Sequence, residues 1–259
     1  MTALAALSQN RLLCTGVGLD AIAEPTLAPA TGSEEAFSNL VSEYYVLFRE
    51  SLASDVSFLQ GVEHHPAVRE FGDCIYKLRT AKQHKDNADA SRFYSRWTSE
   101  HSPWQSAGES LRDLLVQALT ALANTSARVR RDPGLSHAWR DRVATEPAAI
   151  FEAVCTDLSV SFRPTVAKVL VRNVERRLRG LPPHEDARQR IENWCAEEIT
   201  GQSRRLPMSY YSVLDHLGLL GDRRAKAALL LAYSIAATTH LRGDDFLSRL
   251  EEAWKVTTG

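Results

Sequence analysis

The chain has 259 residues, of which 44% are hydrophobic and 24% are charged, so it carries enough apolar side chains for one or two packed domains. Its formal net charge of −1 at pH 7 does not by itself indicate a nucleic-acid or membrane-surface partner. The longest apolar stretch, residues 227–237, is too short to cross a bilayer that needs roughly 20 residues, and we therefore expect no membrane span.

The N-terminal residues 1–32 are predicted to form a flexible tail. They lack a basic start, and their apolar run is broken by Gln9, Asn10 and Arg11, which is unlike a secretory signal. The four cysteines of the chain are scattered without a CxxC spacing, which favours reduced thiols over disulfides or a zinc site. We therefore expect a cytoplasmic protein.

The clearest predicted helix lies between Ser33 and Gln60. Apolar residues recur there at steps of three and four, as they do on the buried side of an α-helix. Ser33 is suited to cap its N-terminus. A second helix is predicted to begin at Pro66 and to end near Asn87, with further helices at 88–100 and 104–124. Residues 33–125 are thus expected to form one helical bundle.

The second part of the chain, residues 126–259, predicts another packed helical array. Pro133, in residues 128–134, indicates a boundary after the bundle. Further helices are predicted around 135–145, 147–158, 164–179, 184–200, 208–220, 222–240 and 243–256. Only residues 154–162 have some strand character. The predicted fold class is therefore all-α.

A polar segment of the second helix, "YKLRTAKQHKDN" at residues 76–87, is the main candidate for a functional site. On a helical wheel, Arg79 and His84 flank an entirely polar stripe that faces away from the core. That stripe consists of Asp73, Tyr76, Thr80, Gln83 and Asn87. The long guanidinium group of Arg79 can lean across it.

The same Arg–His spacing occurs at two other places in the chain. Arg96 and His101 match it just before Pro103, where a helix is expected to close. Arg179 and His184 match it as well, but two prolines between them remove helical geometry. The helical context therefore favours Arg79 and His84.

This arrangement resembles the ribonuclease members of the HEPN superfamily, helical domains with an arginine and a histidine four to six residues apart near the end of a core helix. The predicted helices around the motif also resemble that bundle, over roughly residues 33–125. The family often has Asn, Asp or His after the arginine, whereas this chain has Thr80.

The resemblance implies a metal-independent RNA endonuclease, or an inactive relative, of a bacterial antiviral defence or toxin system. Arg79 and His84 would then be the catalytic pair, in a homodimer whose facing copies form the cleft. Tyr76, Thr80, Gln83 and Asn87 would line that cleft, RNA would be the substrate, and other proteins of the defence system would be partners. No cofactor is implied.

The chemistry of the two residue types agrees with such an activity. An imidazole titrates near neutral pH and can take the proton of a ribose 2′-hydroxyl. A guanidinium group can bind phosphoryl oxygens in a bidentate manner as negative charge develops on them. Two polar residues on a solvated helix would look the same in sequence, so the alternative is a non-enzymatic helical scaffold or adaptor that binds a protein partner.

Three further segments of the sequence are candidates for binding nucleic acid or a metal ion. Arg172, Arg176 and Arg179 are predicted to form a basic ridge on one helix, which could bind RNA phosphates or simply be solvated. His64 and His65 lack partners at metal-ligand spacing, so no metal site is predicted. Residues 209–236 have the outline of a helix-turn-helix, but the second helix is so apolar that we expect it to be buried.

Overall fold

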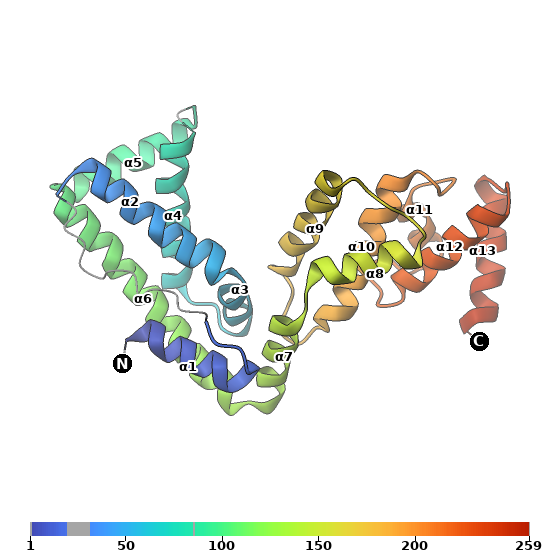
Figure 1. Ribbon diagram of the computed structural model, residues 1–259, viewed down its shortest axis with the longest axis horizontal. Coiled ribbons are helices and arrows are strands. Elements are labelled where there is room, and N and C mark those ends of the chain that lie inside the picture. Colours follow the sequence, from blue (N-terminus) through green and yellow to red (C-terminus); the bar gives the residue numbers. More distant parts are fainter. Residues whose placement is uncertain (1, 20–31, 85, 259) are drawn as a thin grey trace. The chain divides into compact units, whose positions relative to one another are not determined.

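The computed structural model describes residues 2–19, 32–84 and 86–258. All regular structure in these residues is helical, in thirteen α-helices and one π-helix, which confirms the all-α prediction (Figure 1). The chain divides into two compact units. Unit 1 comprises Met1–Val143 with Pro182–His184, and unit 2 comprises Ala144–Leu181 with Glu185–Gly259.

Unit 1 is a bundle around the long helix α6 (Trp104–Arg131). Its other elements are α1 (Ala3–Thr15), α2 (Glu34–Tyr45), the π-helix η1 (Val46–Ser51), α3 (Ala53–Val62), α4 (Pro66–Gln83), α5 (Ala88–Glu100) and α7 (Pro133–Ala144). Helices α1 to α5 all contact α6. With 28 residues α6 is about 42 Å long, so these helices can pack at different levels along it.

Helix α1 contradicts the flexible tail predicted for residues 1–32. Residues 3–15 are helical, Leu4, Leu7 and Cys14 are buried, and the Asn10 side-chain amide donates to Ser126 Oγ at 3.0 Å. Figure 1 shows α1 beside the C-terminal half of α6. The sequence pattern misled because α1 is only partly amphipathic and also exposes leucines. Residues 20–31 of the predicted tail lie outside the described residues.

The helix predicted from Ser33 to Gln60 is interrupted. Ser33 caps α2 as expected, but the π-helix Val46–Ser51 separates α2 from α3. A π-turn has more residues per turn than an α-helix, so it shifts the register of the side chains. Leu47, Phe48 and Leu52 are all buried as a result.

The boundary predicted near residue 125 is also wrong. Helix α6 continues to Arg131, and α7 belongs to unit 1, which ends at Val143. The fully buried Trp139 of α7 stacks on Phe58 of α3, with ring centroids 5.8 Å apart. The Trp139 indole also donates to Asp55 Oδ1 at 2.9 Å. These long-range contacts join α7 to the bundle across the expected break.

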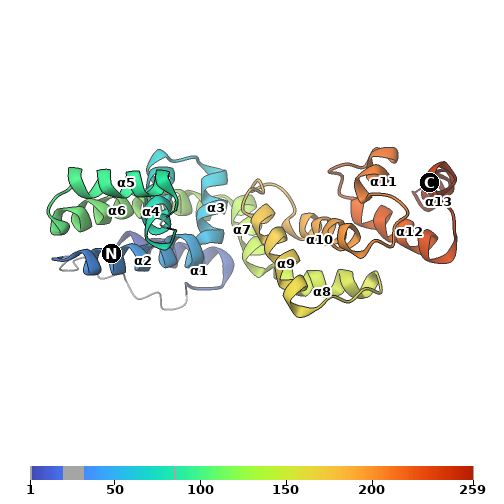
Figure 2. The same cartoon turned by 90° about the horizontal axis from the view of Figure 1, so that it is seen from above.

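Unit 2 contains the remaining helices, arranged around α10. They are α8 (Pro147–Asp157), α9 (Pro164–Leu178), α10 (Ala187–Ser203), α11 (Tyr210–His216), α12 (Ala225–Thr238) and α13 (Gly243–Thr258). Helices α8, α9, α11 and α12 contact α10, and α13 packs on α12 (Figure 2). Residues 154–162, which had some strand character, form the end of α8 and a turn.

Helix α12 is buried, as its apolar sequence predicts. Ala228, Leu229 and Ala232 have no solvent exposure, and the exposed positions of α12, which are Ala227, Ser234, Ala237 and Thr238, carry no arginine or lysine to contact a DNA groove. Among the described residues, no helix combines the length and apolar character needed to cross a membrane.

Candidate functional site

Arg79 lies on α4 and reaches across to α2. Its Nη1 group donates to Ser42 Oγ at 3.1 Å, and its Nε is buried without a hydrogen-bond partner. No carboxylate of the described residues forms an ion pair with it. Arg79, which is partly buried, is thus a positioned cation without an ion-pair partner in the described part of the chain.

His84 lies just beyond the end of the same helix. α4 ends at Gln83 and not near Asn87 as predicted; the backbone N–H of His84 donates to Thr80 O at 2.8 Å and closes the last turn. The backbone of His84 is no longer helical, with φ −126° and ψ 86°. The helical-wheel position predicted for His84 therefore does not apply. Its side chain is exposed, and no hydrogen bond or ion pair to it is found among the described residues.

The four predicted cleft residues differ in burial and contacts, and neither described pocket contains any of them. Thr80 is buried, and Asn87 caps α5 by accepting from the N–H of Ala90 at 3.0 Å. Tyr76 is exposed, with the guanidinium carbon of Arg49 5.5 Å from its ring centroid. Gln83 is exposed as well. A continuous polar stripe was expected, but the helix ends too early to carry it.

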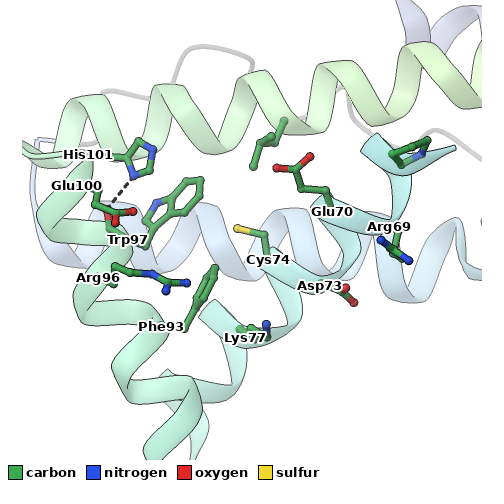
Figure 3. Close-up of a pocket in the computed structure, with 12 residues that line it drawn as sticks. Arg69, Glu70, Asp73, Cys74, Lys77, Phe93, Arg96, Trp97, Glu100 and His101 are labelled. Carbon is green, nitrogen blue, oxygen red and sulfur yellow. Dashed lines mark hydrogen bonds between the residues drawn. The ribbon is translucent and has the colours of Figure 1, made fainter.

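A pocket of about 460 Å³ instead lies between α4 and α5 and is also lined by Leu114 of α6 (Figure 3). Three cations, three carboxylates, a thiol and a histidine line it together with aromatic and apolar groups. The lining residues are Pro66, Arg69, Glu70, Asp73, Cys74, Lys77, Phe93, Arg96, Trp97, Glu100, His101 and Leu114. Neither this pocket nor a second one, beside Ser102 and Trp104, contains Arg79 or His84.

Arg96 and His101, the second Arg–His spacing of the sequence, both line this pocket. His101 Nδ1 lies 2.9 Å from the carbonyl oxygen of Trp97, and the His101 ring stacks on the Trp97 indole. A carbonyl oxygen can only accept a hydrogen bond, so Nδ1 carries the proton and Nε2 of the neutral ring is left as an acceptor. The helix closes before Pro103, as expected: α5 ends at Glu100, so Arg96 lies in its last turns and His101 is its C-cap.

Two cations meet at one aromatic ring in the pocket. Lys77 Nζ and the Arg96 guanidinium carbon lie 5.2 and 5.5 Å from the ring centroid of Phe93. Figure 3 shows both side chains beside this ring. Burial raises the pKa of the Cys74 thiol to about 12, with a smaller contribution from Glu70. Cys74 is therefore a protonated thiol near neutral pH and not a nucleophile.

The predicted ridge of unit 2 forms on α9. Arg172 and Arg176 are exposed, and Arg179 follows the last helical residue with helical backbone angles. The neighbouring Arg177 has a structural role, because it pairs with the buried Glu197 at 2.7 Å and lies over the Trp194 ring. Only part of this basic segment is thus available to a partner.

His64 and His65 of unit 1, the histidines considered as metal ligands, lie beside Glu63 in the sequence. Glu63, beside His64 and His65, accepts a hydrogen bond from Thr125 and pairs with Arg128, and these contacts hold its pKa below the ordinary value. No group of three His, Cys, Asp or Glu side chains in the described parts of the chain is arranged to hold a metal ion.

No family model, curated protein or solved structure matches this chain. The resemblance to HEPN ribonucleases therefore rests on the Arg–His motif and the helical bundle alone.

Proposed function

We propose that unit 1 is a HEPN-like domain that cleaves RNA without a metal ion, in the cytoplasm and as part of a bacterial defence or toxin system. One observation carries the proposal: Arg79 is anchored by Ser42 without a carboxylate partner, and the exposed imidazole of His84 lies five residues later at the end of the same helix. The motif thus supplies a positioned cation and a free base.

The proposed reaction is an attack of the ribose 2′-oxygen on the adjacent phosphorus. His84 takes the 2′-hydroxyl proton, the 2′-oxygen–phosphorus bond forms, and the bond from phosphorus to the 5′-oxygen breaks. Arg79 binds the phosphoryl oxygens while their charge increases, and the 5′-oxygen leaves with a proton from solvent or from a protonated histidine. Neither described pocket contains Arg79 or His84, so the proposal includes a homodimer in which a second copy completes the cleft.

The test is RNA cleavage in EDTA by the purified chain and by His84→Ala and Arg79→Ala variants. Loss of a general base lowers rates by about 10²- to 10⁴-fold, so both variants should lose nearly all cleavage. His137→Ala is a matched control, because His137 is an exposed histidine of the same unit that pairs only with Asp141 among the described residues. Light scattering should show a dimer.

His101→Ala separates the two Arg–His pairs. The proposal expects this variant to keep its cleavage activity once its folding has been verified by circular dichroism. If His101→Ala abolishes cleavage while His84→Ala does not, the reaction takes place in the pocket between α4 and α5, and the assignment of Arg79 and His84 is wrong.

A non-enzymatic scaffold is the second candidate function. The observation that favours it is that neither described pocket contains Arg79 or His84. Equal background cleavage in the parent chain and all variants, together with a monomer in solution, would support a scaffold that binds a protein partner and would refute the nuclease.

A further inference from the structure

The exposed side of α9 carries a row of cations. Lys168, Arg172, Arg176 and Arg179 are spaced four, four and three residues apart, which places them on one side of the helix. All four are exposed, and they extend over about 16 Å of helix axis. We call these four residues the α9 ridge. The ridge predicted from the sequence contained only the three arginines; the structure adds Lys168, which is exposed one turn before Arg172.

The ridge lies on the side of α9 opposite to its core contacts. Leu170 and Val174 are buried where α9 packs on α8 and α10, about half a turn around the helix from the ridge. On a third side, the Asn173 amide donates to Glu198 at 3.1 Å and Arg177 pairs with Glu197. These polar contacts with α10 are thus made by residues outside the ridge, and the side chains of Lys168, Arg172 and Arg176 are exposed to solvent.

The charges of the ridge are poorly balanced. No hydrogen bond or ion pair of the side chains of Lys168, Arg172 or Arg176 is found among the described residues. Glu175 is the one acidic residue on this side of α9, so four cations and one carboxylate give a formal charge of +3. Like charges at a spacing of four residues destabilise a helix. A bound polyanion would relieve that repulsion.

We propose that the α9 ridge binds the phosphate backbone of RNA. Three of its four cations are arginines, whose planar guanidinium groups bind phosphate oxygens in a bidentate manner. A membrane surface is disfavoured, because a helix that lies on lipid inserts a broad apolar face. Leu170 and Val174 of α9 are packed in the core of unit 2, which leaves only Val166 and Val169 as exposed large apolar residues on this helix. The proposal goes beyond cleavage by unit 1 and does not depend on it.

The test is binding of a fluorescent single-stranded 2′-O-methyl RNA, measured by anisotropy at several salt concentrations. The 2′-O-methyl group blocks the cleavage proposed for unit 1, so binding is measured separately from catalysis. Each single-strand phosphate contact contributes about 0.7 to the slope of log affinity against log salt. The double variant Arg172→Gln/Arg176→Gln should therefore lower the slope by about 1.4 and weaken binding about 25-fold at 0.1 M salt.

Two further variants control for net charge. Glu175→Gln removes the acidic residue from the ridge and should tighten binding. Arg188→Gln/Arg249→Gln removes two exposed arginines from α10 and α13, both paired with glutamates of their own helix, and should leave affinity within about twofold. Thermal melts of all variants would verify folding.

Three outcomes would overturn the proposal. The first is an equal loss of RNA affinity in the two double variants, which would show a nonspecific effect of net charge. The second is no RNA binding by the parent chain. The third is tight binding of the parent to vesicles containing anionic lipid that is lost in Arg172→Gln/Arg176→Gln, with weak RNA binding throughout, which would identify a lipid surface as the partner.

Discussion

At the scale of single residues, Asp55 connects three helices of unit 1. This buried residue of α3 accepts hydrogen bonds from Arg11 Nε of α1 at 3.0 Å and from Trp139 Nε1 of α7 at 2.9 Å. Burial raises the pKa of Asp55, while Arg11 and Trp139 act in the opposite direction. The desolvation of the Asp55 carboxyl is therefore opposed by its contacts with Arg11 and Trp139, which join distant parts of the sequence.

Substitution of Asp55 should destabilise unit 1 strongly. Asp55→Ala leaves the partly buried Arg11 and the Trp139 N–H without their acceptor, and breaking a buried pair in this way costs about 3–5 kcal/mol. Trp139→Phe removes the N–H donor and part of the buried ring, but it keeps an aromatic ring against Phe58 and leaves the Arg11–Asp55 pair intact, so its effect should be smaller, about 1–3 kcal/mol. Urea unfolding of the full chain, followed by circular dichroism, measures both. A larger loss for Trp139→Phe would show that packing outweighs the polar network.

Two Arg–His pairs of unit 1 have the same spacing in the sequence but different surroundings in the structure. The Arg96–His101 pair has a fixed histidine tautomer and a pocket, whereas the Arg79–His84 pair has an uncompensated cation and an exposed base. Spacing in the sequence is identical for the two. What distinguishes them is the set of contacts that each side chain makes with other helices.

At the scale of elements, α1 is the main addition to the predicted fold. Its Thr2 hydroxyl caps the N-terminus, and Gly16 ends the helix with the positive φ of 76° that favours glycine. One side of α1 packs along α6, and the Asn10–Ser126 hydrogen bond fixes its position there.

Two leucines of α1 provide a matched test of that packing. Leu7 is fully buried and Leu12 is half exposed. Leu7→Ala should destabilise the protein by about 2–5 kcal/mol, because a buried leucine leaves a cavity. Leu12→Ala should change the free energy of unfolding by less than about 1 kcal/mol. Equal small effects in chemical denaturation would mean that α1 does not pack on α6 in solution.

At the scale of the whole molecule, the described residues form two hydrophobic cores that share no residue. One contains Phe37, Phe71 and Trp139, and the other contains Val154, Leu229 and Phe246. Each unit thus has its own apolar interior, and the proposed roles follow this division: RNA cleavage is assigned to unit 1 and RNA binding to unit 2.

Separate cores predict separate responses to a core substitution. Phe71→Ala removes a fully buried ring from unit 1 and should lower the stability of that unit by about 3–5 kcal/mol. Amide hydrogen exchange followed by mass spectrometry should then show faster exchange in α2, α4 and α6 with little change in α10 and α12. A uniform increase over both units would show that they unfold as one.

The sequence by itself determined the all-α fold class and most of the helices, but not α1 or the π-helix. Val68, Phe71, Ile75 and Leu78 were predicted as the core face of α4, and all four are buried. Such predictions succeed because the 3.6-residue period of an α-helix is a local property of the chain.

Only the tertiary structure decided where the candidate site residues lie and which parts of the chain pack together. The contact between Arg79 and Ser42, the placement of Trp139 against Asp55, and the pocket that receives Arg96 and His101 all join residues that are distant in sequence or lie on different helices. A periodic pattern shows which side of a helix is apolar, but not which other helix covers it. The reason is that helix packing depends on the combined shapes and hydrogen-bonding groups of two surfaces, and one helix specifies only its own.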